Sequence, residues 1–302
     1  MSHFYGILLM FLAACCYGVS GILIKLAYRA GMQPAGLLPL QNVAALICLW
    51  PLLVASGGIA RPRPGRMRLL VWQGLLGNFA ISVCYFWSAQ RIDISLLSII
   101  LFTYPGLVLA YKIAAEKHKT ATSEWSALVL SLAGAVLSVN PFHGTYVRVD
   151  ALGFLLAVGA AASYAFMNIH GQKLSLEMSP QMITAVTSTV STLALMAVLP
   201  ARHWFTLDFT PQQWLYIAAL GLFSTVLPMN LMYLAIRRIG AFHASVVSIA
   251  ELPCILVLAF WILAERISLW QMLGSGLILL SVVLMQFHTS PPPGQDEIGH
   301  VA

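Results

Sequence analysis

One carboxylate lies far inside an apolar stretch of this chain. Glu251 occurs in "SIAELPCIL", two residues before Pro253, within an apolar run over residues 241–263. At 1.5 Å per helical residue it lies roughly 15 Å from the start of that run, near the centre of a helix long enough to cross a bilayer. Because an ionised carboxylate facing lipid costs at least a few kcal/mol, we expect Glu251 to face the protein interior, either protonated or paired.

Two roles fit this carboxylate, and the sequence leaves both open. In the functional interpretation, Glu251 exchanges a proton or binds the ammonium group of a substrate. In the structural interpretation, Pro253 removes a backbone donor and disturbs the helix near residue 249, and protonated Glu251 donates a hydrogen bond to a carbonyl freed there. Either role requires a side chain that points away from lipid.

Neutral polar and aromatic side chains recur at helical spacing in the other apolar runs. Intervals of three or four residues place such side chains on one face of a helix. Singly, an Asn or Ser is explained by hydrogen bonding between helices, and a Tyr by packing or interface anchoring. Together they predict a cavity with apolar walls and few hydrogen-bonding groups, suited to an uncharged or zwitterionic amphipathic solute. With Glu251, the candidate substrate-binding residues are Tyr17, Ser20, Asn78, Ser82, Tyr85, Tyr164, Asn168, Asn230 and Tyr233.

The composition indicates which elements must position these residues. Hydrophobic residues make up 60% of the chain and charged residues only 9%, far below the roughly 25% of charged residues in soluble domains. The predicted fold class is therefore an all-α polytopic membrane protein. A window of about 19 residues predicts ten transmembrane helices, over residues 4–27, 35–56, 68–90, 94–113, 122–139, 150–171, 181–200, 212–236, 241–263 and 267–288.

Charge and cysteine usage bear on location. Of the 16 Lys and Arg residues, ten lie in connections on the side that holds both termini, which predicts a bacterial-type inner-membrane protein with cytoplasmic termini. "LAAC" at 12–15 resembles a lipoprotein cleavage box, but the apolar segment continues to Leu26 and favours a retained helix. All five cysteines lie in apolar runs, which favours packing over disulfides or metal binding. The polar tail 289–302 is predicted to be disordered.

The chain repeats itself at an interval of 147 positions, which aligns Gly74 with Gly221. Each repeat unit contains five predicted helices, so the second copy must cross the membrane in the opposite direction from the first. Such inverted repeats are the construction plan of many secondary transporters. The predicted domains are a first five-helix repeat over residues 1–140 and an inverted second repeat over residues 147–288.

Both repeats have a proline-containing fourth helix that ends in a glutamate, "FTYPGLVLAYKIAAEK" and "AELPCILVLAFWILAER". Each is followed by a fifth helix rich in small residues, "LVLSLAGAVL" and "MLGSGLILLSVVL". With these motifs, nearly all of residues 4–288 resembles the EamA branch of the drug/metabolite transporter superfamily. The resemblance implies a ten-helix basket that opens alternately to either side. It also implies bacterial relatives that export amino acids, aromatic ones included, or other small metabolites.

The two fourth helices differ in one useful respect. Pro105 with Gly106, and Pro253 in the second repeat, each break the helical hydrogen-bond ladder, which makes them candidates for a hinge or gate. Aligning the prolines places Thr103 opposite Glu251, so the acid occurs in one repeat only. A scaffold requirement should apply to both repeats, and this asymmetry therefore favours a functional role for Glu251.

The predicted function is secondary active transport of small amphipathic metabolites by alternating access, with export of amino acids, aromatic or hydrophobic ones included, as the leading case. The alternative is a multidrug or quaternary-cation exporter, with or without proton coupling through Glu251. An intramembrane enzyme and a non-transporting binding subunit are disfavoured, because the predicted helices contain no catalytic motif and the chain contains no Walker loop. The expected partners are a small-molecule substrate and the lipid bilayer, in a monomer or homodimer, without nucleic acid, metal or cofactor.

Overall fold

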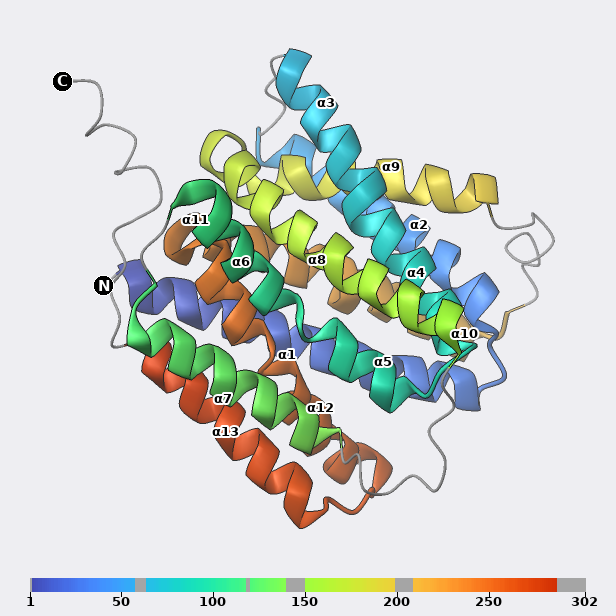
Figure 1. Cartoon of the computed structure of the whole chain (residues 1–302). Coiled ribbons are helices and arrows are strands. Elements are labelled where there is room, and N and C mark those ends of the chain that lie inside the picture. Colours follow the sequence, from blue (N-terminus) through green and yellow to red (C-terminus); the bar gives the residue numbers. More distant parts are fainter. Residues whose placement is uncertain (1, 58–63, 118–119, 140–149, 199–208, 287–302) are drawn as a thin grey trace.

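The structure is a bundle of helices in which the ends of several helices meet inside the protein (Figure 1). The computed structural model describes residues 2–57, 64–117, 120–139, 150–198 and 209–286. Every regular element within these ranges is a helix, so the predicted all-α fold class is confirmed. The tail 289–302, which was expected to be disordered, lies outside the described residues.

Among the described residues, two π-helical segments interrupt the α-helices, one in each half of the chain. The first half contains α1 (Ser2–Arg29), α2 (Pro34–Ala55), α3 (Pro64–Trp72), the π-helical segment η1 (Gln73–Phe79), α4 (Ala80–Ala89), α5 (Ile94–Leu101), α6 (Tyr104–Glu116) and α7 (Thr122–Ser138). The second half contains α8 (Ala151–Glu177), α9 (Pro180–Val198), α10 (Pro211–Leu220), the π-helical segment η4 (Gly221–Val226), α11 (Leu227–Ser248), α12 (Glu251–Leu263) and α13 (Leu269–Gln286).

Eight helical stretches of the described chain are long and apolar enough to cross a membrane, and α12 is a shorter apolar helix. The longest stretch, Pro211–Ser248, has 38 residues, but Gly240 adopts φ 79° and ψ 164° within it, so two helices meet there. α7 has 17 residues, fewer than the roughly 20 of a straight span. The predicted count of ten transmembrane helices is therefore not confirmed, whereas a multi-pass membrane protein is supported.

The two predicted fourth helices are each broken into two pieces. Residues 94–113 divide into α5 and the start of α6, with a turn at residues 102–103. Residues 241–263 divide into the end of α11 and α12, with a turn at residues 249–250. The two turns are separated by the same 147 positions that relate the sequence repeats. Equivalent positions of the two halves thus carry equivalent interruptions.

The prolines do not kink continuous helices, which corrects the interpretation from the sequence. Pro105 is the second residue of α6 and Pro253 the third residue of α12, so each break comes before its proline. Proline suits the first turn of a helix because its missing N–H would have no intrahelical acceptor there and its φ is already helical. Gly106 follows in the same turn, with no neighbouring atom where a Cβ would stand. Their hinge role stays a prediction.

The π-helical segments also occupy equivalent positions, because Gly74 in η1 and Gly221 in η4 are repeat partners. A Cβ on Gly74 would lie 2.7 Å from the Cβ of Val190 in α9. A Cβ on Gly221 would lie 2.9 Å from the backbone nitrogen of Ala45 in α2. Each π-helical segment therefore packs closely against a helix of the other half, and glycine permits that approach.

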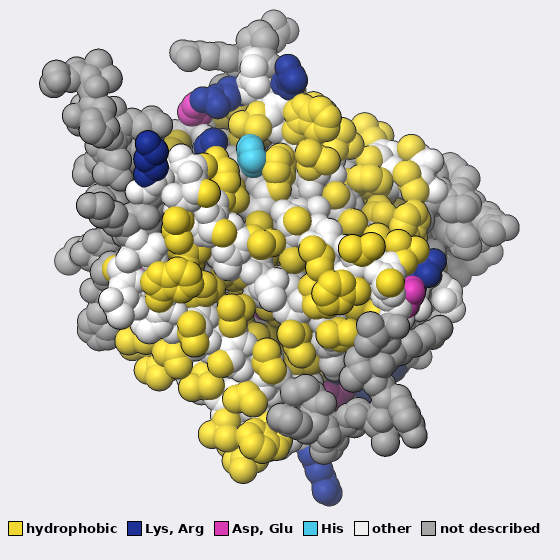
Figure 2. All heavy atoms as spheres, viewed as in Figure 1, with side chains coloured by type: hydrophobic (Ala, Val, Ile, Leu, Met, Phe, Trp, Pro, Cys, Tyr) yellow, Lys and Arg dark blue, Asp and Glu magenta, His cyan; other side chains and the backbone are white. Residues whose placement is uncertain are grey.

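Large apolar side chains cover the outside of the bundle. Figure 2 shows hydrophobic side chains over most of the visible face, with charged side chains near its edges. Trp261, Leu269 and Ile47 are 77%, 68% and 68% exposed. An apolar surface of this extent marks a membrane-facing exterior rather than one in water.

α7 and α13 lie side by side and approach each other through glycine (Figure 1). A Cβ on Gly274 would stand 2.5 Å from the backbone nitrogen of Ser138 and 2.6 Å from the carbonyl oxygen of Gly134. These neighbours are backbone atoms that cannot rotate away. Gly276, two residues along the same helix, has nothing within 4 Å of its Cβ position.

We therefore expect Gly274→Val to lower the free energy of unfolding by about 3 kcal/mol through overpacking, measured by thermal unfolding of the purified protein in detergent. Gly276→Val adds the same atoms to the same helix where space is open, and should leave the unfolding temperature almost unchanged. Equal shifts for the two variants would contradict the close packing of α7 on α13.

Candidate functional site

A cavity of about 260 Å³ lies between helices of both halves of the chain. Apolar walls are supplied by Leu38, Ile81, Leu101, Met167 and Met229. Its polar and aromatic lining residues are Tyr17, Gln41, Asn42, Asn78, Ser82, Tyr164, Ser188, Ser191, Ser224, Thr225 and Glu251. Glu251 is the one residue among all of these with an ionisable carboxyl or amino group. The cavity is therefore rich in neutral hydrogen-bonding groups and has at most a single negative charge.

Glu251 lies at the cavity as the first residue of α12. The first turn of a helix carries the positive end of the helix dipole and unpaired N–H groups, which favour a nearby carboxylate. Within the described chain, no hydrogen bond joins the Glu251 carboxyl to another protein group. The freed carbonyl near residue 249, expected in the structural interpretation, does not accept a hydrogen bond from it. The carboxyl is therefore available to a bound solute, water or proton.

Tyr104 joins the two helix breaks. Its side chain is 1% exposed, and its hydroxyl donates to the carbonyl oxygen of Ser245 at 3.1 Å and also contacts the hydroxyl of Ser248. The N–H of Ile249 bonds to the oxygen of Val246, at 3.3 Å, rather than to the Ser245 carbonyl. That carbonyl also accepts a hydrogen bond from the Ser248 hydroxyl at 2.7 Å. Tyr104 thus supplies one of two hydroxyl donors to a backbone carbonyl at the end of α11.

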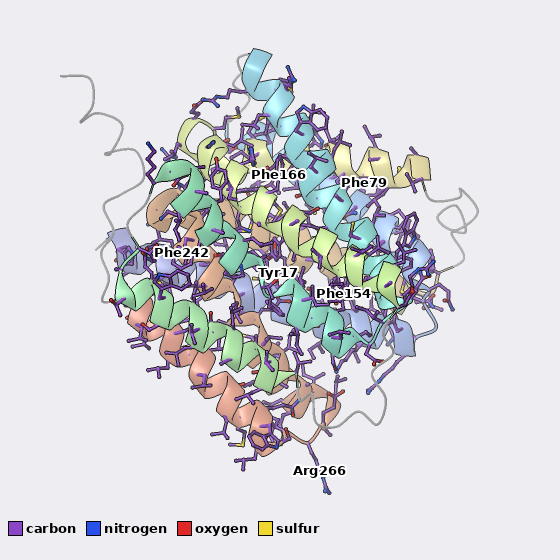
Figure 3. All side chains as sticks on the ribbon, in the orientation of Figure 1. Tyr17, Phe79, Phe154, Phe166, Phe242 and Arg266 are labelled. Atoms are coloured by element: carbon purple, nitrogen blue, oxygen red, sulfur yellow. The ribbon has the colours of Figure 1, made fainter. Side chains whose placement is uncertain are left out.

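Aromatic rings extend from this junction to the cavity. The Tyr104 ring stacks on that of Tyr164, with centroids 4.2 Å apart and planes at 21°. Tyr164 and Tyr17, which line the cavity, come from α8 and α1. Figure 3 shows Tyr17 near the middle of the bundle, whereas Arg266 points away from its lower end. The cavity therefore has an aromatic wall connected to the helix breaks.

The structure brings five of the ten predicted site residues to the cavity: Tyr17, Asn78, Ser82, Tyr164 and Glu251. The other five, Ser20, Tyr85, Asn168, Asn230 and Tyr233, lie outside its lining. Spacing along a helix predicted shared faces, but it did not show which faces turn toward the cavity.

Local hydrogen bonds occupy most of these five side chains. The Ser20 hydroxyl donates to the carbonyl oxygen of Tyr17 at 2.8 Å. The side-chain amides of Asn168 and Asn230 each donate to the carbonyl four residues earlier, at 2.9 and 2.7 Å. Tyr233 is fully buried, and Tyr85 is 36% exposed at the edge of α4. Back-bonding to the helix is the ordinary fate of Ser and Asn inside helices.

Tyr233 instead belongs to a buried polar group beside the cavity. Its hydroxyl lies 3.3 Å from Nε2 of Gln73, which also donates to the carbonyl oxygen of Met167 at 2.7 Å. Gln73 is the first residue of η1 and is completely buried. These hydrogen bonds hold η1 against α8 and α11, next to the part of η1 that contains Asn78.

Sequence reasoning missed six polar residues of the cavity: Gln41, Asn42, Ser188, Ser191, Ser224 and Thr225. Four of them lie on α2 and α9, from which the sequence analysis drew no candidate, and two lie on η4, within the predicted helix 212–236 that supplied Asn230 and Tyr233. Signals were present, since Gln41 and Asn42 interrupt an apolar run and "TAVTSTVST" over residues 184–192 is dense in hydroxyls. Polar residues are also common between packed membrane helices, so the sequence alone did not identify these six as cavity residues.

Charged pairs lie away from the cavity and connect the two halves. Lys25 in α1 pairs with Glu265 after α12, with Nζ and Oε1 3.0 Å apart. Arg91 pairs with Asp150 before α8, again at 3.0 Å. The Arg91 guanidinium hydrogen-bonds this exposed carboxylate and lowers the pKa of Asp150. All four side chains are partly exposed, so the pairs stabilise the fold little.

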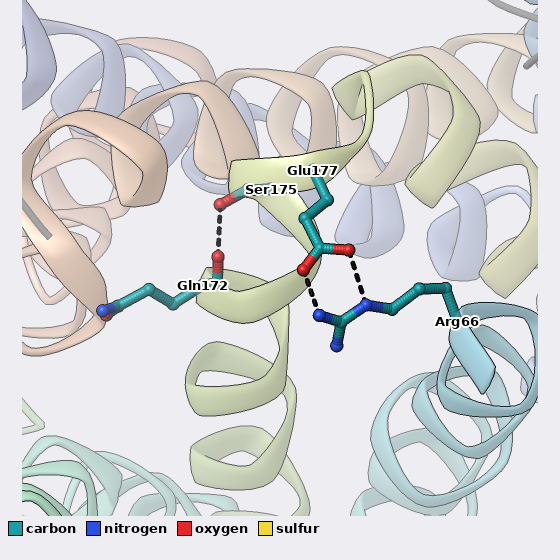
Figure 4. A network of polar contacts seen from close by, with 4 residues as sticks. All are labelled: Arg66, Gln172, Ser175 and Glu177. Atoms are coloured by element: carbon teal, nitrogen blue, oxygen red, sulfur yellow. Dashed lines mark hydrogen bonds and ion pairs between the residues drawn. The ribbon is translucent and has the colours of Figure 1, made fainter. Parts of the chain in front are cut away.

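A third pair lies at the other end of α8. Figure 4 shows the Arg66 guanidinium meeting both carboxylate oxygens of Glu177. Gln172 turns to another side, and its Oε1 accepts a 2.6 Å hydrogen bond from the backbone nitrogen of Ala241. That hydrogen bond gives the backbone N–H of Ala241 an acceptor where the helix resumes after the non-helical Gly240. The three ion pairs therefore lie away from the cavity, whose lining combines neutral polar groups with the single carboxyl of Glu251.

The arrangement agrees with the comparisons with known proteins. The sequence profile of the EamA-like transporter family matches residues 4–140 and again residues 151–287. The chain belongs to the EamA-like transporter family. Family and relatives point to membrane transport of a small molecule rather than to catalysis.

Relatives of this EamA-like transporter carry transporter names. It is 21% identical to the uncharacterized transporter YcbK of Bacillus subtilis over 93% of each chain. It is 26% identical to the pseudopaline exporter CntI of Pseudomonas aeruginosa, over 72% of this chain and 74% of the relative. One solved protein structure superposes with a TM-score of 0.78 over 93% of this chain and 96% of the other, at 15% identity. Identity that low shows a shared fold alone.

The Tyr104 junction of this EamA-like transporter can be tested by removing one oxygen atom. We expect Tyr104→Phe to lower the free energy of unfolding by about 1 kcal/mol, because the buried Ser245 carbonyl loses one of its two hydroxyl donors and keeps the one from Ser248. Tyr111→Phe is the matched control, since among the described residues the Tyr111 hydroxyl accepts a single hydrogen bond, from the exposed Lys173 Nζ at 3.2 Å, and surface changes usually stay within about 0.5 kcal/mol. Chemical denaturation in mixed micelles measures the free energy of unfolding of both variants. Equal losses in Tyr104→Phe and Tyr111→Phe would contradict a stabilising role for the Tyr104 hydroxyl.

Proposed function

We propose that this protein is a secondary active transporter that exports small amphipathic metabolites by alternating access, with amino acids, aromatic or hydrophobic ones included, as its leading substrates. The observation that carries the proposal is the cavity between the two halves, with Glu251 as its one carboxyl. The name of one relative, the pseudopaline exporter CntI, supports export as the direction. We further propose the topology expected from the sequence, with both termini in the cytoplasm of a bacterial cell.

The size of the cavity favours a small solute. Its volume of about 260 Å³ is just below the roughly 300–1,000 Å³ typical of sites for drug-sized ligands. A free amino acid needs less room than a multidrug substrate with several rings. Tyr17 and Tyr164 add aromatic surface on which an aromatic side chain or a cationic group can stack.

The polar groups of the cavity suit a zwitterion. Glu251 provides a negative partner for an ammonium group. Oε1 of Gln41 and Oδ1 of Asn78 are buried atoms that find no hydrogen-bond partner within the described chain, so these two side-chain amides have capacity left for a solute or water. Lys, Arg and His are absent from the lining residues. A solute with a net negative charge therefore has no charged partner there and is disfavoured.

The repeated interruptions support alternating access. Broken helices in equivalent positions of two halves are typical of secondary transporters, where they surround the substrate site. The turns at residues 102–103 and 249–250 and the segments η1 and η4 form two such pairs. π-helical segments occur frequently at functional sites. We propose that the halves are inverted repeats over residues 1–140 and 147–288, and that these interruptions are the positions where the helices bend.

A cation exporter is the second candidate, and one observation favours it. The single carboxyl and the tyrosines together also suit an organic cation without a carboxylate. Counterflow in proteoliposomes distinguishes the two candidates. We expect labelled phenylalanine or leucine to exchange against unlabelled amino acids and not against quaternary ammonium ions. The reverse pattern would replace the amino-acid proposal with the cation exporter.

Glu251→Gln tests the carboxyl within the same assay. The variant keeps the size and hydrogen bonding of the side chain but removes its charge and proton, so we expect initial flux to fall at least about tenfold, equivalent to 1.4 kcal/mol. The remaining flux should lose any dependence on pH that the unmodified protein shows. Glu265→Gln is the matched control, because within the part of the chain that the structure describes this exposed glutamate pairs with Lys25 alone, and its loss should change flux less than about twofold. An unchanged pH dependence in Glu251→Gln would exclude proton coupling through this residue.

A further inference from the structure

We propose that Cys15 and Cys254 form an oxidation site whose disulfide fixes α1 to α12 and stops transport. The proposal that transport stops rests on the proposed function, whereas the disulfide itself does not. The sequence indicated packing roles for all cysteines, and the described cysteines are indeed free thiols. The contact between these two adds a chemistry that their positions in the sequence, 239 residues apart, did not reveal.

The two sulfur atoms are in direct contact across a close helix pair. The Sγ atoms of Cys15 in α1 and Cys254 in α12 are 3.0 Å apart. One turn along α1, a Cβ on Gly18 would lie 2.9 Å from the Cβ of Cys254 and 3.3 Å from the backbone nitrogen of Ile255. The two backbones thus approach closely enough at this point for a disulfide to join them with little movement.

The other cysteines do not share this arrangement. Cys16 is the next residue of α1, yet within the described chain no hydrogen bond or disulfide to a second thiol is found for Cys16, for Cys48 in α2 or for Cys84 in α4. Among the described residues, no group of three or more His, Cys, Asp or Glu side chains is placed to hold a metal ion. Pairing of two thiols is therefore the chemistry that this geometry suits.

The position of the pair links it to the cavity. Cys254 follows Glu251 by three residues, which places both on neighbouring turns of one face of α12. Cys15 precedes the cavity residue Tyr17 by two positions. α12 begins at the turn after α11, where its angle to α11 can change. Such a change requires α12 to slide along α1 at their contact. A covalent bond between Cys15 and Cys254 would prevent that movement.

Hydrogen peroxide supplies the oxidising equivalents. One thiol attacks a peroxide oxygen, the O–O bond breaks, and a sulfenic acid and one water form. The second thiol attacks the sulfenic sulfur, the S–O bond breaks as the S–S bond forms, and the hydroxyl leaves with the thiol proton as a second water. Two thiols and one peroxide thus give one disulfide and two waters. Thiol reductants reverse the reaction by exchange.

Peroxide treatment of the purified, membrane-reconstituted protein tests the site. We expect mass spectrometry after non-reducing digestion to find the Cys15 peptide joined to the Cys254 peptide, and dithiothreitol to release it. Cys15→Ser and Cys254→Ser should each abolish the joined peptide, and Cys16→Ser should keep it. Recovery of unlinked Cys15 and Cys254 peptides from the treated protein would overturn the proposal.

Flux in the same vesicles tests the consequence. We expect counterflow to fall in proportion to the cross-linked fraction, to recover with dithiothreitol, and to resist peroxide in Cys15→Ser but not in Cys16→Ser. Full flux in protein shown to be cross-linked would overturn the fixation of α1 to α12. Absence of flux in the reduced, unmodified protein would contradict the proposed function instead, while the joined peptide would still decide the oxidation site.

Discussion

Backbone groups freed inside an apolar bundle need internal partners, and the centre of this structure follows from that constraint. A bilayer offers no water to a broken helix, yet two helices break at equivalent positions, residues 102–103 and 249–250. The Tyr104 hydroxyl satisfies the Ser245 carbonyl at 3.1 Å, and Pro105 and Pro253 occupy first turns where a missing N–H has no consequence. The breaks are thus tolerated where the two halves meet.

The cavity is a consequence of those breaks and of the π-helical segments. η1 packs on α9 and η4 packs on α2, each through a glycine, and all four elements contribute polar side chains to the cavity. This near-symmetric frame is interrupted by one asymmetry. Thr103 lies in the turn between α5 and α6, and its hydroxyl donates to the Ile100 carbonyl at 2.6 Å. Glu251 begins α12, and its carboxyl has no hydrogen-bond partner among the described residues. The chemistry of the site therefore depends on the half that carries the acid.

Much of this could be predicted from the sequence, since composition and apolar length determine the fold class and the helices with few exceptions. Aligning Pro105 with Pro253 also predicted interruptions in the two fourth helices. That alignment placed the prolines inside kinked helices, because a sequence does not distinguish a proline that bends a helix from one that begins the next. Nothing local marks η1 or η4, whose neighbours are distant in the chain. Spacing placed Asn168 and Asn230 among the candidate residues, but only packing showed that both lie outside the cavity lining and that their amides bond to their own helices.

The central claim is that Glu251 binds the ammonium group of a solute inside the cavity. Binding titrations of the purified protein with phenylalanine and with 3-phenylpropionate, which lacks the ammonium group, test it most directly. A charge-assisted hydrogen bond predicts that phenylalanine binds at least about tenfold more tightly, and that Glu251→Gln removes this preference. A preference that survives unchanged in Glu251→Gln would contradict the claim.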